Sequence, residues 1–479
     1  MREICVVSAA LALAIVAGCH QEERENQVDL DRVLPQLAAA AAPSEQLTLL
    51  DSLSNVDPAT APQWKQPLLA EVRTFLHDPS PILAAKAGDL LSHWGDRSAA
   101  SALQRLLHSA DPFIRLSAAA SLGTLGDPAA ADDLAKATTD PDPLVQAQAC
   151  TALGNLGAPP KPATANALRA ALADADGAVR AAAALSIGRT GMHEAAPSLL
   201  TLVSDPDPGV ASAAARALGD LHVEEAAALL RQMLTRDSQP IQRAAAAGLA
   251  ELGDRTAIPQ LSALLTSDDP ALRMAGLNAL RDLGDPAALP AVLTVAGDAD
   301  PRVETRVAFA LASLYRPDQL PFLLHSLKQD RPDARAAVAF GLGLAQEHRA
   351  LANLVEALHD PSFRVRARAA EGLGVLGDRR ALPAVEEAAY NDPDPEVRDP
   401  ARIILGVMQR TEGDLVTRLI DSLSDDRAGV RVFAANTLGL LRTPRAVAAL
   451  RRVTETDEES LVRNAATLSL LRITRNLDV

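Results

Sequence analysis

Apolar and polar positions recur along this chain with a period of about 31 residues. One segment begins with Asp-Pro at 111–112, continues through an alanine-rich apolar run and ends in Leu-Gly at 125–126. Arg115 marks a fixed position in this pattern, and its equivalents recur down the sequence. A period of 20–50 residues is the signature of a repeat array. The marker positions are residues 84, 115, 146, 180, 211, 242, 273, 304, 335, 366, 398, 431 and 463.

Each repeat contains the start and stop signals of two helices. Asp caps a helix through its side chain, Pro fits the first helical turn, and Gly ends the helix in a turn. A second apolar stretch, such as residues 257–265, leads into the next Asp-Pro. Aromatic residues make up only 2% of the chain, against 48% hydrophobic residues, which favours close-packed helices over sheets. We therefore predict an all-α superhelix, a solenoid of about 13 two-helix repeats.

The repeats do not cover the whole chain, and one of them is irregular. Residues 30–77 contain two or three helical stretches without a marker, which predicts an N-terminal cap before the solenoid at 78–479. Pro400 lies inside the expected helix of the eleventh repeat. Because proline blocks the preceding turn, we expect this helix to restart after it.

The N-terminus has the character of an export signal. Met1 and Arg2 lead into an uncharged apolar run that ends in Gly18-Cys19. Small residues before a cysteine resemble the lipobox of bacterial lipoproteins. This resemblance implies a signal peptide at 1–18, lipidation of Cys19 and a flexible tether at 19–29. His20 in place of aspartate implies the outer membrane, facing the periplasm. The alternative is an ordinary signal peptide in which Cys19 is incidental.

The repeat unit resembles the short HEAT-like repeats of phycobilin lyases over residues 78–479. The resemblance implies that the marker helices line a concave side and that marker Arg and loop Asp form a ladder between repeats. Gln146, Ala211, Gln242 and Glu304 stand in place of the arginine at their markers. Arg is kept at 115, 180, 273, 335, 366, 398, 431 and 463.

Offsets two, five and nine from the marker fall on the helix face opposite the alanine and leucine positions, so we expect them to face the concavity. Asp220, Glu251 and Asp282 place an acidic strip on this face. Later repeats are apolar there, which predicts either a groove for a protein or peptide partner or burial by a tighter superhelix. The apolar positions are Phe309, Phe340, Leu344, Val375, Ile403, Val407 and Leu440.

Signals for catalysis are sparse. HEAT-like deoxyhypusine hydroxylases use several His-Glu pairs, whereas this chain offers His193-Glu194 and the reversed Glu347-His348. We therefore predict no metal, no cofactor and no catalytic residues. Cys150 is expected to be a small core residue.

The net charge of −15, with dispersed arginines, argues against nucleic-acid binding. The sequence thus predicts a monomeric, lipid-anchored scaffold of the cell envelope that binds a protein or peptide along its concave face. The alternative is a HEAT-repeat enzyme or chromophore-handling protein related to phycobilin lyases or deoxyhypusine hydroxylase.

Overall fold

In this computed structural model the structure describes residues 30–40, 42–56, 62–157, 161–409 and 415–474, without the side chains at 55, 62, 301, 304, 305 and 440. These residues form helices and turns with no strand among them, so the predicted all-α class is confirmed. The predicted signal peptide, Cys19 and the tether lie outside the described residues. No helix in the described ranges is long and apolar enough to span a membrane. The described chain divides into two compact units, 30–257 and 258–474.

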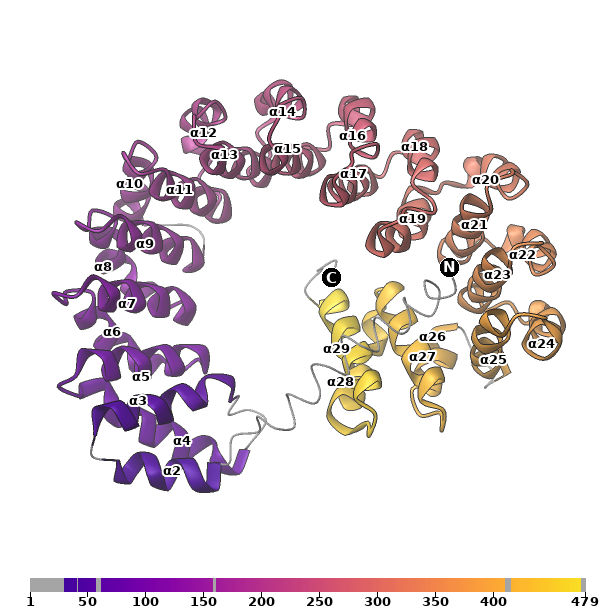
Figure 1. Ribbon diagram of the computed structural model, residues 1–479. Helices are drawn as coiled ribbons and strands as arrows, with labels where there is room; N and C mark the ends of the chain where they lie inside the picture. The colour runs from indigo at the N-terminus through magenta and orange to yellow at the C-terminus, as the bar shows by residue number, and fades with distance from the viewer. Residues whose placement is uncertain (1–29, 41, 57–61, 158–160, 410–414, 475–479) are drawn as a thin grey trace. The chain divides into compact units, whose positions relative to one another are not determined.

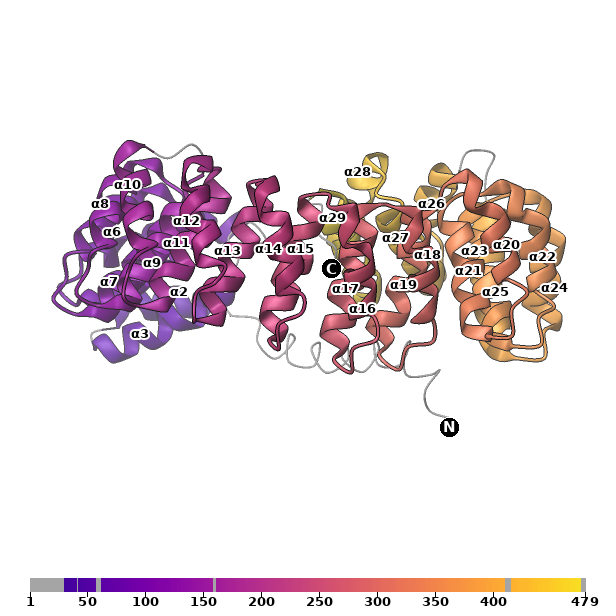
Figure 2. The same cartoon turned by 90° about the horizontal axis from the view of Figure 1, so that it is seen from above.

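The first unit opens with three helices and continues with paired ones (Figures 1 and 2). The opening helices are α2 (Leu30–Ala39), α3 (Pro43–Ser52) and α4 (Pro62–Thr74). The marker helices are α5 (Pro81–His93), α7 (Pro112–Leu125), α9 (Pro143–Asn155), α11 (Gly177–Thr190), α13 (Pro208–Asp220) and α15 (Gln239–Glu251). The second helices, mostly shorter, are α6 (Ala100–Leu106), α8 (Ala131–Ala137), α10 (Pro162–Ala171), α12 (Ala196–Leu202) and α14 (Ala227–Met233).

The second unit repeats the same pairing. Its marker helices are α17 (Pro270–Leu283), α19 (Pro301–Leu314), α21 (Pro332–Leu344), α23 (Phe363–Leu376), α25 (Pro395–Gln409), α27 (Ala428–Leu440) and α29 (Ser460–Thr474). The second helices are α16 (Ile258–Leu264), α18 (Leu289–Thr294), α20 (Leu320–Ser326), α22 (Leu351–Ala357), α24 (Leu382–Asn391), α26 (Leu415–Ser422) and α28 (Val447–Thr456). In each unit the marker helices form one layer and the second helices form the other (Figure 1).

The helix boundaries follow the predicted capping chemistry. Asp111 precedes α7, and its side chain accepts a hydrogen bond from the Phe113 amide while Pro112 takes the first helical position. Gly126 ends α7 with φ of 64°, a left-handed conformation that glycine adopts at little cost. A short 3₁₀ turn then leads into the second helix, a detail that the repeat pattern did not predict. Cys150 is fully buried, as expected, and burial raises the pKa of its thiol to about 12.

Glycines bring successive marker helices into close contact. A Cβ added to Gly219 of α13 would lie 2.7 Å from the Cα of Gly248 in α15. A Cβ added to Gly372 of α23 would lie 2.6 Å from the carbonyl oxygen of Ala339 in α21. Real Cβ atoms do not approach so closely, so these backbones pack at a distance that larger residues would prevent.

The expectation for Pro400 is wrong. Helix α25 starts at Pro395 and continues through Pro400 to Gln409 without a restart. The proline costs about 3 kcal/mol in a helix interior because one backbone hydrogen bond is lost. Val397, Ala401 and Ile404 are fully buried against the flanking helices, and this packing holds the helix together across the proline.

Paired arginine and aspartate side chains connect successive repeats, as the resemblance implied. Arg115 donates from Nε and Nη2 to the two carboxylate oxygens of Asp140, both at 2.7 Å, and from Nη1 to the Ser109 carbonyl at 2.9 Å. The Asp140 carboxylate also accepts from the Asp142 amide at 2.9 Å. The guanidinium therefore ties its own loop to the loop of the next repeat. The same link joins Arg180 to Asp205, Arg273 to Asp298, Arg335 to Asp360, Arg366 to Asp392 and Arg431 to Asp457.

At three of the markers that lack arginine, another side chain donates a hydrogen bond to the loop instead. Gln242 reaches back eight residues and donates to the Leu234 carbonyl at 3.0 Å. Ala211 cannot donate, and Arg236 from the next loop instead donates to the Val203 carbonyl at 3.1 Å. After the marker at 304, Arg331 likewise donates to the Ala296 carbonyl at 3.0 Å. In all three repeats the acceptor is the carbonyl eight residues before the marker.

A second polar link joins the residue that follows α19 to the turn before α22. Glu347 is buried and accepts hydrogen bonds from the Tyr315 hydroxyl and from Arg349, whose Nη2 lies 2.7 Å from Oε2. The hydrogen bonds from Arg349 and Tyr315 outweigh burial and lower the pKa of Glu347 to about 2.

The Arg366 link gives a stability prediction. Substitution R366M would leave the buried Asp392 carboxylate without its bidentate partner, so we expect a loss of about 3 kcal/mol in unfolding free energy. Urea unfolding followed by circular dichroism measures this. The control is R302M, whose side chain is 73% exposed and pairs within its own loop, and it should unfold like the wild type. Equal midpoints for the two variants would contradict the role of the link.

The Glu347 link predicts a loss of stability in acid. Because its folded-state pKa is depressed from 4.5 to about 2, its contribution is complete above pH 4.5 and disappears as the pH falls toward 2. We expect E347Q to lower stability at pH 7 by on the order of 2 kcal/mol and to flatten this part of the pH profile. Thermal unfolding between pH 7 and pH 2.5 tests this, with E356Q as the exposed control. An unchanged profile in E347Q would refute the assignment.

Candidate aromatic interface

An aromatic pair lies where the apolar face was predicted to begin. Phe309 of α19 and Phe340 of α21 are both half-buried, and their ring centroids lie 6.3 Å apart with the planes at 75°. This edge-to-face arrangement is favourable because the positive edge of one ring meets the negative face of the other. The two rings connect neighbouring marker helices at the same offset from their markers.

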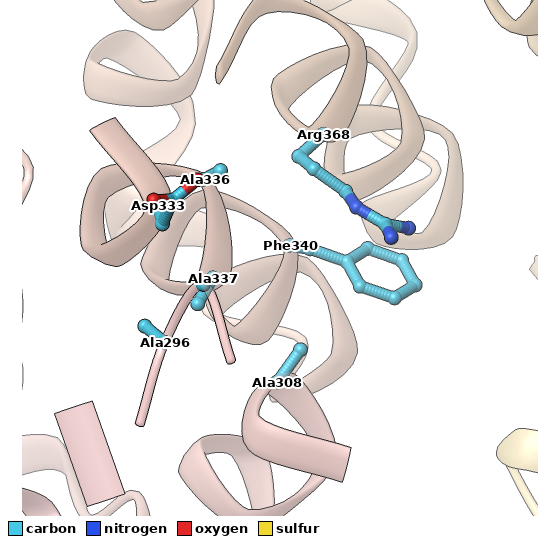
Figure 3. A pocket seen from close by; sticks show the side chains of 8 residues that line it. Ala296, Ala308, Asp333, Ala336, Ala337, Phe340 and Arg368 are labelled. Atoms are coloured by element: carbon cyan, nitrogen blue, oxygen red, sulfur yellow. The ribbon is translucent and has the colours of Figure 1, made fainter. Parts of the chain in front are cut away.

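Arg368 extends the pair onto a third helix. Its guanidinium carbon lies 5.4 Å from the centroid of the Phe340 ring, a cation–π contact (Figure 3). Its Nη1 lies 2.7 Å from a carboxylate oxygen of Glu371. We call Phe309, Phe340 and Arg368 the aromatic row. The sequence interpretation identified the two phenylalanines but missed Arg368. Its place at offset two from the marker Arg366 was a usable signal, because that offset shares the face of offset five.

The cavity beside the aromatic row is small. Its volume of about 30 Å³ has room for one or two water molecules, whereas sites for organic ligands are typically several hundred Å³. Asp333 lies at its edge, with a carboxylate oxygen 3.1 Å from Arg364. A partner would therefore contact the outer surface of the aromatic row, because the cavity is too small to enclose it. The cavity is lined by Ala296, Gly297, Ala308, Asp333, Ala336, Ala337, Phe340 and Arg368 (Figure 3).

The other predicted apolar residues differ in accessibility. Leu344 and Ile403 are half-buried, and the Leu440 side chain lies outside the described residues. Val375 and Val407 are 1% and 0% exposed, so they pack in the interior and cannot contact a partner directly. Gln346 from the preceding repeat also donates to the Val375 carbonyl at 2.7 Å. Burial was the alternative reading of this face, and it applies to these two valines.

The predicted acidic residues are exposed but have basic neighbours. Partial desolvation raises the pKa of Asp220, while Arg216, His222 and Arg189 oppose this rise. Glu251 lies on the next marker helix, where its carbonyl oxygen is 3.0 Å from Nδ1 of His222. Basic groups thus lie beside the Asp220 carboxylate. Asp282 belongs to the other unit and contacts Arg281 at 2.8 Å.

The His-Glu pairs are not arranged as a metal centre. His193 and Glu194 are exposed in a short 3₁₀ turn, and Glu347 is held by Arg349 and Tyr315. His348 is exposed and lies 3.6 Å from Asp378. Within the described ranges no three His, Cys, Asp or Glu side chains gather closely enough to hold a metal ion.

Comparisons with solved structures returned helical-repeat proteins. The complex of CpcE and CpcF of phycocyanin lyase from Nostoc sp. PCC7120 is 24% identical, with a TM-score of 0.36 over 51% of this chain and 94% of that one. Kap95p from its structure with RanGDP is 13% identical, with a TM-score of 0.46 over 94% of this chain and 71% of that one. The Kap95:Nup1 complex gives 11% identity and a TM-score of 0.47 over 93% of this chain and 79% of that one. A comparison with functionally curated proteins gave no match.

A family match covers most of the sequence. The description of the matching family is HEAT repeats, and the matched segments overlap from residue 68 to residue 471. They are 68–154, 132–219, 165–247, 235–312, 263–337, 320–406 and 391–471. This span coincides with the helix pairs and their arginine–aspartate links. The chain therefore belongs to the HEAT repeat family.

Proposed function

We propose that this HEAT-repeat chain is a lipid-anchored scaffold of the bacterial cell envelope that binds a protein or peptide partner through the aromatic row. The observation that carries the proposal is the half-buried row of Phe309, Phe340 and Arg368 on three successive marker helices. Aromatic residues and arginine contribute most of the binding free energy in many protein interfaces. Such residues on one repeated helix face favour a binding surface over an isolated packing contact.

The surroundings of the aromatic row favour a macromolecular partner. Leu344 and Ile403 extend the half-buried apolar surface, while Val375 and Val407 support it from the interior. Glu371 and Asp333 add carboxylates beside the arginines, a mixture typical of the polar rim around an apolar interface. The small cavity offers little volume to an organic molecule, which favours a partner that contacts the aromatic row from outside.

The proposed anchor is Cys19, on the strength of the apolar run and small residues that precede it. Lipidation there would hold the chain at the outer membrane facing the periplasm without a spanning helix, provided that more than one acyl chain is attached. In this proposal the protein is a monomer that binds no cofactor and catalyses no reaction. Stoichiometric iron or a bound pigment in the purified protein, measured by elemental analysis and absorbance, would favour the enzyme or chromophore-handling alternative.

The aromatic row predicts a separation of binding from stability. In the double variant F309A/F340A we expect recovery of the partner to fall at least tenfold, because the anchoring side chains are gone. The loss of stability should stay near 1–2 kcal/mol, because both rings are only partly buried. The measurement is crosslinking in native envelopes followed by mass spectrometry, alongside urea unfolding of the purified protein.

The matched control is F322A, which removes a partly buried phenylalanine of α20 in the layer of second helices. It should reduce stability by a similar amount and leave the crosslinked partners unchanged. If F309A/F340A keeps full partner recovery while losing stability, the aromatic row is a packing element and the proposed interface is wrong.

The anchor is tested separately. In C19S the acylated thiol is absent, so we expect no labelling by radioactive palmitate and a shift of the protein from the membrane fraction to the soluble fraction. C150S is the control, since that thiol is buried and should not be modified. Continued labelling of C19S would refute lipidation at Cys19.

A further inference from the structure

Three exposed apolar side chains occupy the same repeat position in the first three marker helices. Ile82, Phe113 and Leu144 each lie two residues before their marker, and they are 53%, 73% and 59% exposed. We call them the N-terminal apolar row. Their helices α5, α7 and α9 succeed one another in the layer of marker helices (Figure 1). The side chains therefore recur at the spacing of adjacent helices.

The N-terminal apolar row shares a helix face with offsets two, five and nine. Offset minus two is seven residues from offset five, so the two positions differ by only about 20° around a helix. The sequence interpretation examined the later offsets and missed this one. The signal that could have revealed it is the bulky apolar residue directly after Pro81, Pro112 and Pro143.

The fold does not require apolar side chains at these positions. The next three repeats carry Ala178, Gly209 and Pro240 there, all exposed, and form the same helix pair. Single exposed hydrophobic residues are common on protein surfaces, but three large ones in one register on adjacent helices form a patch. The N-terminal apolar row is thus an apolar surface that packing leaves uncovered.

Negative charge accompanies the apolar side chains. Asp111 accepts from the Phe113 amide at 2.9 Å, and Asp142 accepts from the Leu144 amide at 2.8 Å, so a carboxylate is held beside each of these residues. The nearby cation Arg115 is already held in the bidentate link to Asp140. Residues 78–157 contain nine aspartates and five lysines or arginines, with no glutamate. A cationic partner complements this charge.

The spacing of the helices limits the shape of such a partner. Adjacent packed helices lie about 8–10 Å apart. A polyproline II segment presents one side chain per turn to the same side, at intervals of about 9.3 Å from three residues of about 3.1 Å each. Such a segment crossing α5, α7 and α9 would place every third side chain against one member of the row.

We propose that the N-terminal apolar row binds an extended cationic peptide segment with an apolar residue at every third position. This inference rests on the proposed function as a protein-binding scaffold and assigns to the unit 30–257 a surface of its own. The apolar side chains of the segment cover Ile82, Phe113 and Leu144. Its cationic side chains pair with the carboxylates of Asp111 and Asp142.

The experiment uses the full chain and a fluorescein-labelled peptide of three Pro-Leu-Lys triplets, measured by fluorescence anisotropy at low salt. We expect saturable binding that weakens at least tenfold in I82S/F113S/L144S and weakens as salt is added. Because the three side chains are exposed, this variant should keep the thermal midpoint of the wild type. Peptides with Glu in place of Lys, or Ser in place of Leu, should bind at least tenfold more weakly.

Two protein controls separate this surface from the aromatic row. L468S removes an exposed leucine elsewhere and should bind the peptide like the wild type. F309A/F340A should also bind it fully, so loss of the native partner in that variant concerns only the proposed function. No binding of the Lys peptide to the wild type, or equal binding by I82S/F113S/L144S, would overturn the inference.

Two further measurements test whether a membrane or a second copy of the chain covers the row instead. In a C19S background, which lacks the proposed lipid anchor, flotation with phosphatidylcholine vesicles that I82S/F113S/L144S abolishes would assign the row to a membrane surface instead. A dimer in sedimentation that the triple substitution abolishes would assign it to a second copy of the chain. Either result without peptide binding overturns the proposal.

Discussion

The bidentate bond between a marker arginine and the aspartate of the next repeat holds each array in register. One guanidinium binds a carboxylate across the repeat boundary and carbonyl oxygens within its own loop, as Arg115 does with Asp140 and Ser109. Helix pairs with short second helices bury little surface alone, so their stability depends on the contacts with neighbouring repeats. The bond fixes those contacts at the loops, while close-packed glycines such as Gly219 fix them between helix axes.

Both proposed surfaces depend on the alignment of successive repeats, which the arginine–aspartate bonds maintain at some boundaries and substitutes such as Arg331 at others. Phe309 contacts Phe340 and Phe340 contacts Arg368, so the aromatic row needs its three marker helices to lie side by side. The exposed side chains on α5, α7 and α9 likewise form a row because the repeat places them at one level of the stack. A regular spacing of side chains is itself a recognition feature, since it selects partners with a matching period.

Local chemistry made the helix pairs predictable from sequence, whereas contacts between repeats were harder to foresee. Asp111, Pro112 and Gly126 act within a few residues, so their roles could be inferred directly. The continuation of α25 through Pro400 and the burial of Val375 and Val407 depend on how closely neighbouring helices pack. The period alone does not encode that distance. Arg368 escaped notice for the same reason, because its significance comes from a ring on another helix.

The substitutes for missing marker arginines make the repeats unequal as building blocks. Arg236 stands 25 residues after Ala211, at the place where Asp205 stands after Arg180, so the donor has moved across the boundary to the following loop. A deletion that joined the Arg180 helix to the Arg236 loop would set two guanidinium groups against each other. Loss or gain of a repeat would therefore preserve these bonds at boundaries whose donor and acceptor still match. The charged groups in each loop thus determine which repeats can follow it without losing a hydrogen bond.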